Sequence, residues 1–240
     1  MKITEKIIAH NKNFAGTPPV LMAFLGDSVT HGCFEVFVAA NGGLDCIYDY
    51  EAVYHNLLRK RLEEICPASP VNILDAGVSG GSAPYGLNRI ERDVLRFSPD
   101  FVSVCFGLND ACSGEDGLPS YLNALDGIFK RLKAADIETV FLTPNCMNTY
   151  VDSRIEFDKL KQIAEDIAKI QNSGMLTRYI DAAKDVCNKN EIPVCDVYGR
   201  WMNMQKSGID TTLLLSNHIN HPTRPLHKLF SDMLFDMIIN

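Results

Sequence analysis

The sequence lacks the features that mark several classes of protein. No two of its eight cysteines stand in a C-x-x-C pair, which disfavours a zinc knuckle or a thioredoxin-type site. Basic residues are fewer than acidic ones, 23 against 30, and the formal net charge is -7. Because a nucleic-acid binder needs basic residues to replace phosphate counterions, we expect no nucleic-acid partner. The same charge balance disfavours docking on an anionic membrane surface.

Long apolar segments are also missing. Residues 1–10 contain no apolar core of a secretory signal, and no run approaches the length that spans a bilayer. Several cysteines stand in apolar runs such as residues 104–106, where cysteine usually behaves as a small buried hydrophobe. We therefore expect a cytoplasmic protein with reduced cysteines and no membrane partner. Nothing in the sequence predicts its oligomeric state.

What the sequence does contain is an alternation of short apolar runs and longer amphipathic segments. Short, continuous apolar runs are typical of strands that are covered on both faces, and they occur at residues 20–25, 71–76, 100–106, 138–143 and 193–197. Helices are predicted over residues 49–65, 87–97, 119–135 and 225–239, with two more over 154–190 that are separated near residues 172–174. Residues 34–50 are predicted to form a long loop. This alternation predicts a parallel α/β sheet in a single domain over residues 1–240.

Residues with catalytic chemistry follow the predicted strands. Gly26-Asp27-Ser28 ends the first strand, a Gly-Val-Ser-Gly-Gly-Ser run at 77–82 follows the second, and Gly-Leu-Asn-Asp at 107–110 follows the third. His221-Pro222 stands just before the last predicted helix. In open parallel sheets, ligands bind beyond the carboxyl ends of the strands. A nucleophile, free backbone N–H groups, an amide and a histidine gathered there are the groups that acyl transfer requires.

These four motifs resemble those of the SGNH hydrolases, which are also called the GDSL esterase/lipase family. They occur in the order of that family and span nearly the whole chain. The resemblance implies a three-layer α/β/α sandwich with a five-stranded parallel sheet, the flavodoxin-like SGNH hydrolase fold. It also implies hydrolysis of a small-molecule ester without a cofactor.

The resemblance assigns a role to each matching residue. It implies that Ser28 is the nucleophile and that His221 is the general base. The oxyanion hole would consist of the Ser28 and Gly80 backbone N–H groups and the Asn109 side-chain amide. These roles fit the chemistry, because a serine hydroxyl is a poor nucleophile until a neighbouring imidazole takes its proton.

One position departs from the family pattern. The family usually has an aspartate three residues before the histidine, and here that position is His218. Three explanations compete for what orients His221: a backbone carbonyl that accepts its Nδ1–H, a neutral side chain such as Asn217 or His218, or an acid from elsewhere such as Asp196. We favour the first two, because a neutral partner that fixes the tautomer preserves part of the rate.

Other residues near these motifs have structural interpretations. The Asp27 carboxylate is expected to accept N–H groups of its own loop. His31 follows Ser28 by three residues, so it lines the pocket or belongs to a solvated loop. A metal site at His218 and His221 is disfavoured because the loop offers no neighbouring carboxylate ligand, and we expect no metal.

The favoured function is hydrolysis of a short-acyl or acetyl ester, with carbohydrates among the candidate alcohols. One alternative is a non-catalytic ligand-binding protein that retains the hydrolase cleft. Another is a lipase or thioesterase that acts on longer acyl chains. A metal-dependent hydrolase that uses His218 and His221 is a third, less favoured alternative.

Overall fold

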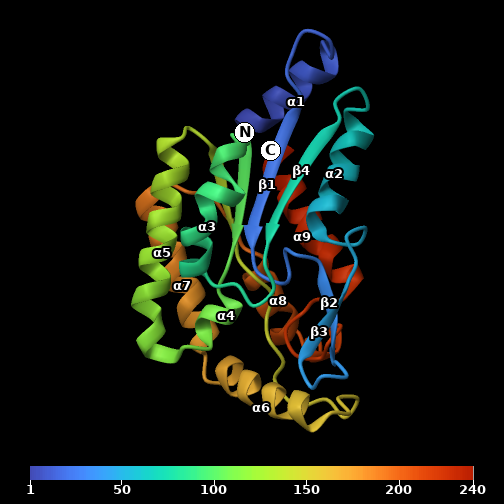
Figure 1. Cartoon of the computed structure of the whole chain (residues 1–240), viewed down its shortest axis with the longest axis vertical. Helices are drawn as coiled ribbons and strands as arrows, with labels where there is room; N and C mark the ends of the chain where they lie inside the picture. The colour runs from blue at the N-terminus through green and yellow to red at the C-terminus, as the bar shows by residue number, and fades with distance from the viewer. Residues whose placement is uncertain (240) are drawn as a thin grey trace.

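A computed structural model describes residues 1–239 of the chain, and at its centre lies a parallel sheet between two layers of helices (Figure 1). The strands, in chain order, are β1 (Val20–Gly26), β2 (Cys33–Val38), β3 (Leu44–Tyr48), β4 (Val71–Gly77), β5 (Phe101–Cys105), β6 (Glu138–Leu142) and β7 (Val194–Cys195). The helices are α1 (Lys2–Lys12), α2 (Tyr54–Ile65), α3 (Ala83–Asp93), α4 (Leu108–Ala111), α5 (Gly114–Ala134), α6 (Asp158–Asn172), α7 (Met175–Asn190), α8 (Val197–Lys206) and α9 (Arg224–Ile239). Two short 3-10 helices are η1 (Leu95–Phe97) and η2 (Thr212–Leu214).

The sheet has the strand order β4-β1-β5-β6-β7, and every pairing is parallel. In chain order this is the 2-1-3-4-5 arrangement of flavodoxin-like folds. All five residues of β5 are buried, as expected for a strand that is covered on both faces. The predicted fold class is therefore confirmed, and the predicted bounds of the five strands are correct to within two residues.

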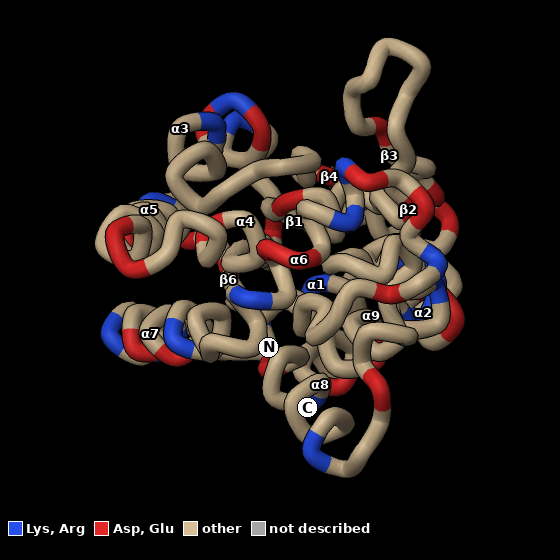
Figure 2. Tube along the Cα trace, turned by 90° about the horizontal axis from the view of Figure 1, so that it is seen from below, with Lys and Arg blue, Asp and Glu red and all other residues tan. Residues whose placement is uncertain are grey.

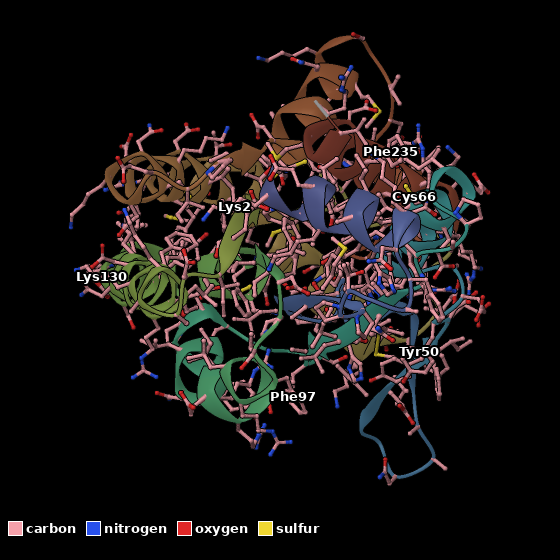
Figure 3. All side chains as sticks on the ribbon, turned by 90° about the horizontal axis from the view of Figure 1, so that it is seen from above. Lys2, Tyr50, Cys66, Phe97, Lys130 and Phe235 are labelled. Carbon is pink, nitrogen blue, oxygen red and sulfur yellow. A yellow bond between two sulfur atoms is a disulfide. The ribbon has the colours of Figure 1, made fainter. Side chains whose placement is uncertain are left out.

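The helices form the two outer layers. On one face of the sheet α3 packs on α5 and α5 on α7, while on the other face α2 packs on α9 (Figure 1). Figure 3 views the molecule from the end at which the strands begin, where α1 packs on β1 and α9. The loops that follow the strands lie at the opposite end of the molecule.

The predicted long loop over residues 34–50 is wrong. Most of it forms an antiparallel hairpin of β2 and β3, which extends from the body of the molecule (Figures 1 and 3). The turn contains Asn41 and Gly42, and Gly42 has a φ of 78°. A tight turn followed by a glycine with positive φ is a common hairpin connection, so the Asn-Gly pair was a hairpin signal in the sequence.

The expectation that all cysteines are reduced is wrong for one pair. Cys33 and Cys46 form a disulfide across the hairpin, with their Cα atoms 5.9 Å apart. The two positions could not be paired from the sequence, because the hairpin that brings them together was not predicted. The other six cysteines are free, and all of them except Cys112 are buried.

Some helix bounds also differ from the prediction. The separation near residue 172 is confirmed, since α6 ends at Asn172 and α7 begins at Met175. Helix α5 begins before Pro119, which lies inside it near its start, and α1 and α8 were not predicted. Within residues 1–239, no helix has the length and apolar character that crossing a membrane requires.

Candidate active site

The four principal residues predicted from the motifs lie together at the carboxyl ends of the strands. Ser28 follows β1, Gly80 follows β4, Asn109 lies in α4 after β5, and His221 precedes α9. All four line one cleft with a volume of about 380 Å³. Figure 2 looks onto this end of the molecule, with α6 crossing it and the hairpin of β2 and β3 at one side.

Ser28 and His221 are joined by a hydrogen bond. The Ser28 Oγ lies 2.9 Å from the His221 Nε2, and the two residues are only 5% and 4% exposed. Ser28 lies in a turn between β1 and β2. The turn is stabilised by Asp27, whose Oδ1 accepts the Val29 N–H at 2.9 Å. This is the loop-stabilising contact that was expected of Asp27.

The other ring nitrogen of His221 contacts the hairpin. Its Nδ1 lies 2.9 Å from the backbone carbonyl oxygen of Phe34 in β2. A carbonyl only accepts hydrogen bonds, so Nδ1 carries the proton in the neutral ring. The Nε2 lone pair is then available to accept the proton of the Ser28 hydroxyl. The structure thus contains the backbone-carbonyl arrangement, the first of the three explanations for the missing aspartate.

The neutral side chains proposed as partners of His221 do not contact its ring. The Asn217 Oδ1 accepts the backbone N–H groups of Ile219, Asn220 and His221 at 2.9–3.0 Å, so Asn217 shapes the loop that carries the histidine. His218 adopts a φ of 56°, and its buried Nδ1 has no hydrogen-bond partner among the described residues.

The third explanation, an acid from elsewhere, is not supported either. Asp196 caps α8, where its Oδ1 accepts the Gly199 N–H at 3.0 Å. Its carboxylate also accepts hydrogen bonds from Thr143 and Lys184. These contacts hold Asp196 at the end of β7, where it makes no hydrogen bond to His221.

Burial determines the charge state of His221. Removal of the ring from water lowers the pKa of His221 to about 4, against the opposing effects of its bond to Phe34 and of the Glu35 carboxylate. Burial disfavours the charged imidazolium. His221 is therefore neutral near pH 7, which is the form that can take a proton.

Three donors are available around the Ser28 hydroxyl. Among residues 1–239, neither the Ser28 N–H nor the Gly80 N–H donates to another protein group. Gly80 has a φ of 74°, which glycine adopts without strain, and a Cβ added there would meet nothing within 4 Å. The Asn109 Nδ2 donates to the Gly81 carbonyl at 2.9 Å, which fixes the amide and leaves its second N–H unused.

Two buried carboxyl groups are sequence neighbours of these donors, since Asp27 precedes Ser28 and Asp110 follows Asn109. Burial raises the pKa of Asp27 to about 7, and the neighbouring Asp110 adds to that shift. Burial likewise raises the pKa of Asp110 to about 6, although its Oδ1 accepts the Ala83 N–H at 2.9 Å. Each keeps one oxygen without a partner in the described part of the chain. Through their other oxygens, the two carboxyl groups accept backbone N–H groups of segments next to the site.

His31 lies behind the wall of the cleft. Its Nδ1 is 3.2 Å from the Ser79 Oγ, and its ring packs against Tyr48 at 4.7 Å between centroids. Ser79 and Tyr48 themselves line the cleft. His31 therefore supports the wall and does not contact Ser28 or His221 through a hydrogen bond.

The cleft lies between the hairpin and α6. Its apolar wall consists of Val36 and Leu44 from the hairpin and of Leu160, Ile163 and Ile167 from α6. Polar side chains, including those of Asn109 and Asn217, line the part near His221. Within residues 1–239, no group of three or more His, Cys, Asp or Glu side chains is arranged to hold a metal ion.

Two further groups hold His221 in place, and only one of them had a signal in the sequence. The Phe34 carbonyl could not be recognised, because a backbone acceptor leaves no trace in the identity of its side chain. Asn145 follows β6, and its Nδ2 donates to the Asn220 carbonyl at 2.8 Å. Its position after a predicted strand was a signal for a role near the site, but its partner lies 75 residues away.

Comparisons with known proteins identify the family of the chain. The model of the GDSL-like Lipase/Acylhydrolase family matches residues 24–229, whereas a comparison with curated proteins gave no match. The structure resembles that of an acetyl xylan esterase, AlAXEase, with 17% identity, a TM-score of 0.67, and coverage of 91% of this chain and 99% of that chain.

Two further structures have the same fold. Axe2, an acetylxylan esterase from Geobacillus stearothermophilus, has 16% identity and a TM-score of 0.67, with 91% of this chain and 94% of that chain covered. A lipase/acylhydrolase from Enterococcus faecalis has 19% identity and a TM-score of 0.65, with 91% and 95% covered. Likeness at these identities establishes the fold alone. The family model covers most of the sequence, and the chain therefore belongs to the GDSL-like lipase/acylhydrolase family of carboxylic-ester hydrolases.

Proposed function

We propose that this chain is a serine esterase, formed by one domain over residues 1–240, that hydrolyses a small carboxylic ester through an acyl-enzyme on Ser28. The observation that carries this proposal is the chain of two hydrogen bonds from the Ser28 hydroxyl through His221 to Phe34. Both bonds measure 2.9 Å, and both side chains are buried. A base that is held in the correct tautomer against a serine hydroxyl is the arrangement that activates a nucleophile.

In the acylation step, the Ser28 Oγ attacks the ester carbonyl while the His221 Nε2 takes the hydroxyl proton. The carbonyl oxygen becomes an oxyanion that accepts hydrogen bonds from the Ser28 N–H, the Gly80 N–H and the Asn109 amide. Preorganised donors of this kind stabilise charge that develops in the transition state. The bond between the carbonyl carbon and the alcohol oxygen then breaks, and His221 returns the proton to the leaving alcohol.

The deacylation step repeats these roles with water. The His221 Nε2 takes a proton from a water molecule, which attacks the acyl carbon and forms the second oxyanion. When this intermediate collapses, the acid leaves and the proton returns to the Ser28 Oγ. No cofactor is needed, because both proton transfers use the same imidazole.

We further propose that the acyl group is short, with acetyl as the first choice and a carbohydrate as a candidate alcohol. Two relatives of the same fold are described as acetyl xylan esterases, which supports this choice by analogy. The mixed lining of the cleft supports it as well, since the side-chain amides of Asn217 and Asn220 have further N–H groups that can donate to a polar alcohol.

Replacement of the nucleophile tests the central step. We expect Ser28→Ala to reduce hydrolysis of p-nitrophenyl acetate by at least about 1,000-fold, because loss of a triad nucleophile costs that much or more. It should also abolish labelling by a serine-reactive fluorophosphonate. Ser79→Ala removes another hydroxyl of the same cleft and is the matched control, which should still be labelled. If the wild-type protein is not labelled at Ser28, the alternative of a non-catalytic binding protein is favoured.

A panel of p-nitrophenyl esters tests the length of the acyl chain. The apolar wall of α6, which includes Ile163 and Ile167, is the feature that favours a lipase or thioesterase. We expect kcat/KM to be highest for acetyl and butyryl esters and to fall at octanoyl and beyond. A steady rise from acetyl to dodecanoyl would replace the short-acyl proposal with the long-chain alternative.

We propose that the protein is located in the cytoplasm. Six free cysteines, five of them buried, favour a reducing environment. The Cys33–Cys46 disulfide opposes this proposal, because disulfides are rare in reducing compartments, so the redox state of that pair in cells is the deciding observation. Alkylation of thiols in intact cells, followed by mass spectrometry, tests this. A disulfide in nearly all molecules at the time of trapping would contradict it.

A further inference from the structure

Arg224 connects the helix that follows His221 to both strands of the hairpin. It is the first residue of α9, three positions after His221. Its Nη1 and Nη2 donate to the two carboxylate oxygens of Glu35 at 2.7 and 3.2 Å, and its Nε donates to the Asp49 Oδ2 at 2.7 Å. Glu35 lies in β2, and Asp49 directly follows β3. One guanidinium therefore connects β2 and the end of β3 to the first residue of α9.

The same guanidinium also packs on the residue whose carbonyl holds His221. The Arg224 Cζ lies 4.4 Å from the centroid of the Phe34 ring, which is fully buried. The Phe34 ring also packs against His227 with 4.6 Å between centroids. A cation placed over an aromatic ring is attracted to its face. These contacts with α9 fix the position of the Phe34 side chain, and with it the position of the Phe34 carbonyl.

We propose that Arg224 is a positioning residue for His221, on which it acts through the backbone of Phe34. In a Ser-His-Asp triad, the acid beside Nδ1 fixes the ring in one orientation and one tautomer. Here the acceptor is a backbone carbonyl, which has no side chain of its own to anchor it. The contacts of Arg224 with Phe34 and Glu35 supply that anchor. This proposal rests on the proposed function, because Arg224 has no positioning role in catalysis if His221 is not a base.

The energetics favour a geometric role over a contribution to stability. The Arg224 and Glu35 side chains are 38% and 37% exposed, and pairs of this kind add little to the free energy of unfolding. Bidentate contacts with a carboxylate are, however, directionally specific. A displacement of about 1 Å in a catalytic group lowers turnover by about 100-fold. A weak but directional contact can therefore have a large effect on rate.

Arg224 also neutralises Glu35, whose charge acts on the imidazole of His221. The titratable and charged groups around His221, Phe34 and His227 are Glu35 from β2, Asp49 after β3, His55 from α2, and Arg224 and His227 from α9. Glu35 raises the pKa of His221, whereas burial keeps His227 neutral. Removal of Arg224 leaves the two carboxylates without their cation, which favours the imidazolium form of His221. The pKa of His221 should then rise.

Two replacements of Arg224 test the proposal. We expect Arg224→Met to lower kcat for p-nitrophenyl acetate by about 100-fold, with KM changed by less than about threefold, because the ring is misplaced and substrate contacts are retained. We expect Arg224→Lys to recover about tenfold of that loss, since an ammonium restores the charge without the bidentate geometry. The acid limb of kcat/KM should move to higher pH in Arg224→Met.

The pH readout separates a positioning role from a purely structural one. The double variant Arg224→Met/Glu35→Gln removes the uncompensated carboxylate, so its acid limb should return towards that of the wild-type protein while kcat stays low. Arg59→Met is the matched control. The Arg59 Nη1 pairs with Glu63 at 2.7 Å at similar exposure, on α2 and outside the cleft. We expect it to leave kcat, KM and the acid limb unchanged.

If Arg224→Met does not fold, as judged by its melting temperature and circular dichroism, Arg224→Lys and Glu35→Gln carry the test. Each should lower kcat by more than the loss of folded protein, calculated from its melting temperature, would explain. The proposal is overturned if the folded variants keep kcat within twofold of wild type and an unchanged acid limb. Labelling of wild-type Ser28 by a fluorophosphonate distinguishes that outcome from failure of the proposed function, in which the wild-type protein itself is not labelled.

Discussion

At the scale of single residues, the atom that receives the Nδ1–H of His221 determines how the proposed base would behave. A carboxylate in this place would stabilise the imidazolium by its charge, whereas the Phe34 carbonyl is neutral. The pKa of His221 is lowered to about 4 because burial outweighs the favourable effects of Phe34 and Glu35. A dyad of this kind has a weaker base than a triad, but one that is unprotonated over a wider range of pH.

This predicts how activity depends on pH. His221 must be neutral to act as a base, so kcat/KM should fall only as the pH drops towards about 4, well below the ordinary histidine value of 6.5. The second-order rate of fluorophosphonate labelling at Ser28, measured from pH 3.5 to 8, gives the same pKa without dependence on a substrate chromophore. An acid limb at pH 6.5 or above would show that His221 is not desolvated as described.

Single residues also show which parts of the site a sequence can reveal. Ser28, Asn109 and His221 were predictable because their side chains belong to recognisable motifs. The Phe34 carbonyl has no such signature. Arg224 stands close to His221 in the sequence, but its partner Glu35 is 189 positions away, so their pairing depends on a fold that had first to be known.

At the scale of elements, the hairpin of β2 and β3 combines several functions. It provides the Phe34 carbonyl, part of the apolar wall of the cleft and both cysteines of the disulfide. Its strands were missed because most of their residues are partly or fully exposed, so they lack the continuous apolar runs that identified the strands of the sheet. The strands of the sheet are covered on both faces, and their bounds were therefore predictable.

The disulfide should stabilise this element measurably. Cys33 and Cys46 are separated by 13 positions, and closing a loop of this length in the unfolded chain is worth about 3 kcal/mol. We expect the oxidised wild-type protein to exceed Cys33→Ser/Cys46→Ser in free energy of unfolding by up to that amount in urea titrations. Cys112→Ser removes an exposed free thiol and serves as the control. Equal midpoints for oxidised wild type and the double variant would contradict the prediction.

At the scale of the whole molecule, the strand order brings the site together. Residues 28, 80, 109 and 221 come from four separate regions of the chain. Parallel strands place the first three at one edge of the sheet, and the segment before α9 brings His221 to the same cleft. The alternation of strands and helices predicted a parallel sheet, but alternation alone allows several strand orders. The family resemblance implied a flavodoxin-like fold, whereas the 2-1-3-4-5 order depends on long-range packing that no local pattern specifies.

The sheet and its helices also enclose Asp27 and Asp110, which links the stability of the molecule to pH. Burial raises the pKa of Asp27 from 3.8 to about 7. An acid whose pKa is higher in the folded chain stabilises the fold at low pH, and this contribution disappears as the pH rises through the folded value. His221 and His227, whose pKa values burial lowers, act in the opposite sense. Because these opposing contributions overlap in pH, only a comparison of variants can isolate Asp27.

Asp27→Asn provides that comparison, because an amide retains the oxygen that accepts the Val29 N–H and does not titrate. Relative to wild type, its free energy of unfolding should rise by several kcal/mol, up to about 4, between pH 4 and pH 8, since each unit of pKa shift corresponds to about 1.4 kcal/mol. Urea titrations at intervals of one pH unit measure the difference, and the histidine contributions cancel because both proteins contain them. Asp136→Asn, at a carboxylate that is 93% exposed, is the control and should follow wild type at every pH. A difference between Asp27→Asn and wild type that stays constant from pH 4 to 8 would mean that Asp27 is already ionised in the folded protein.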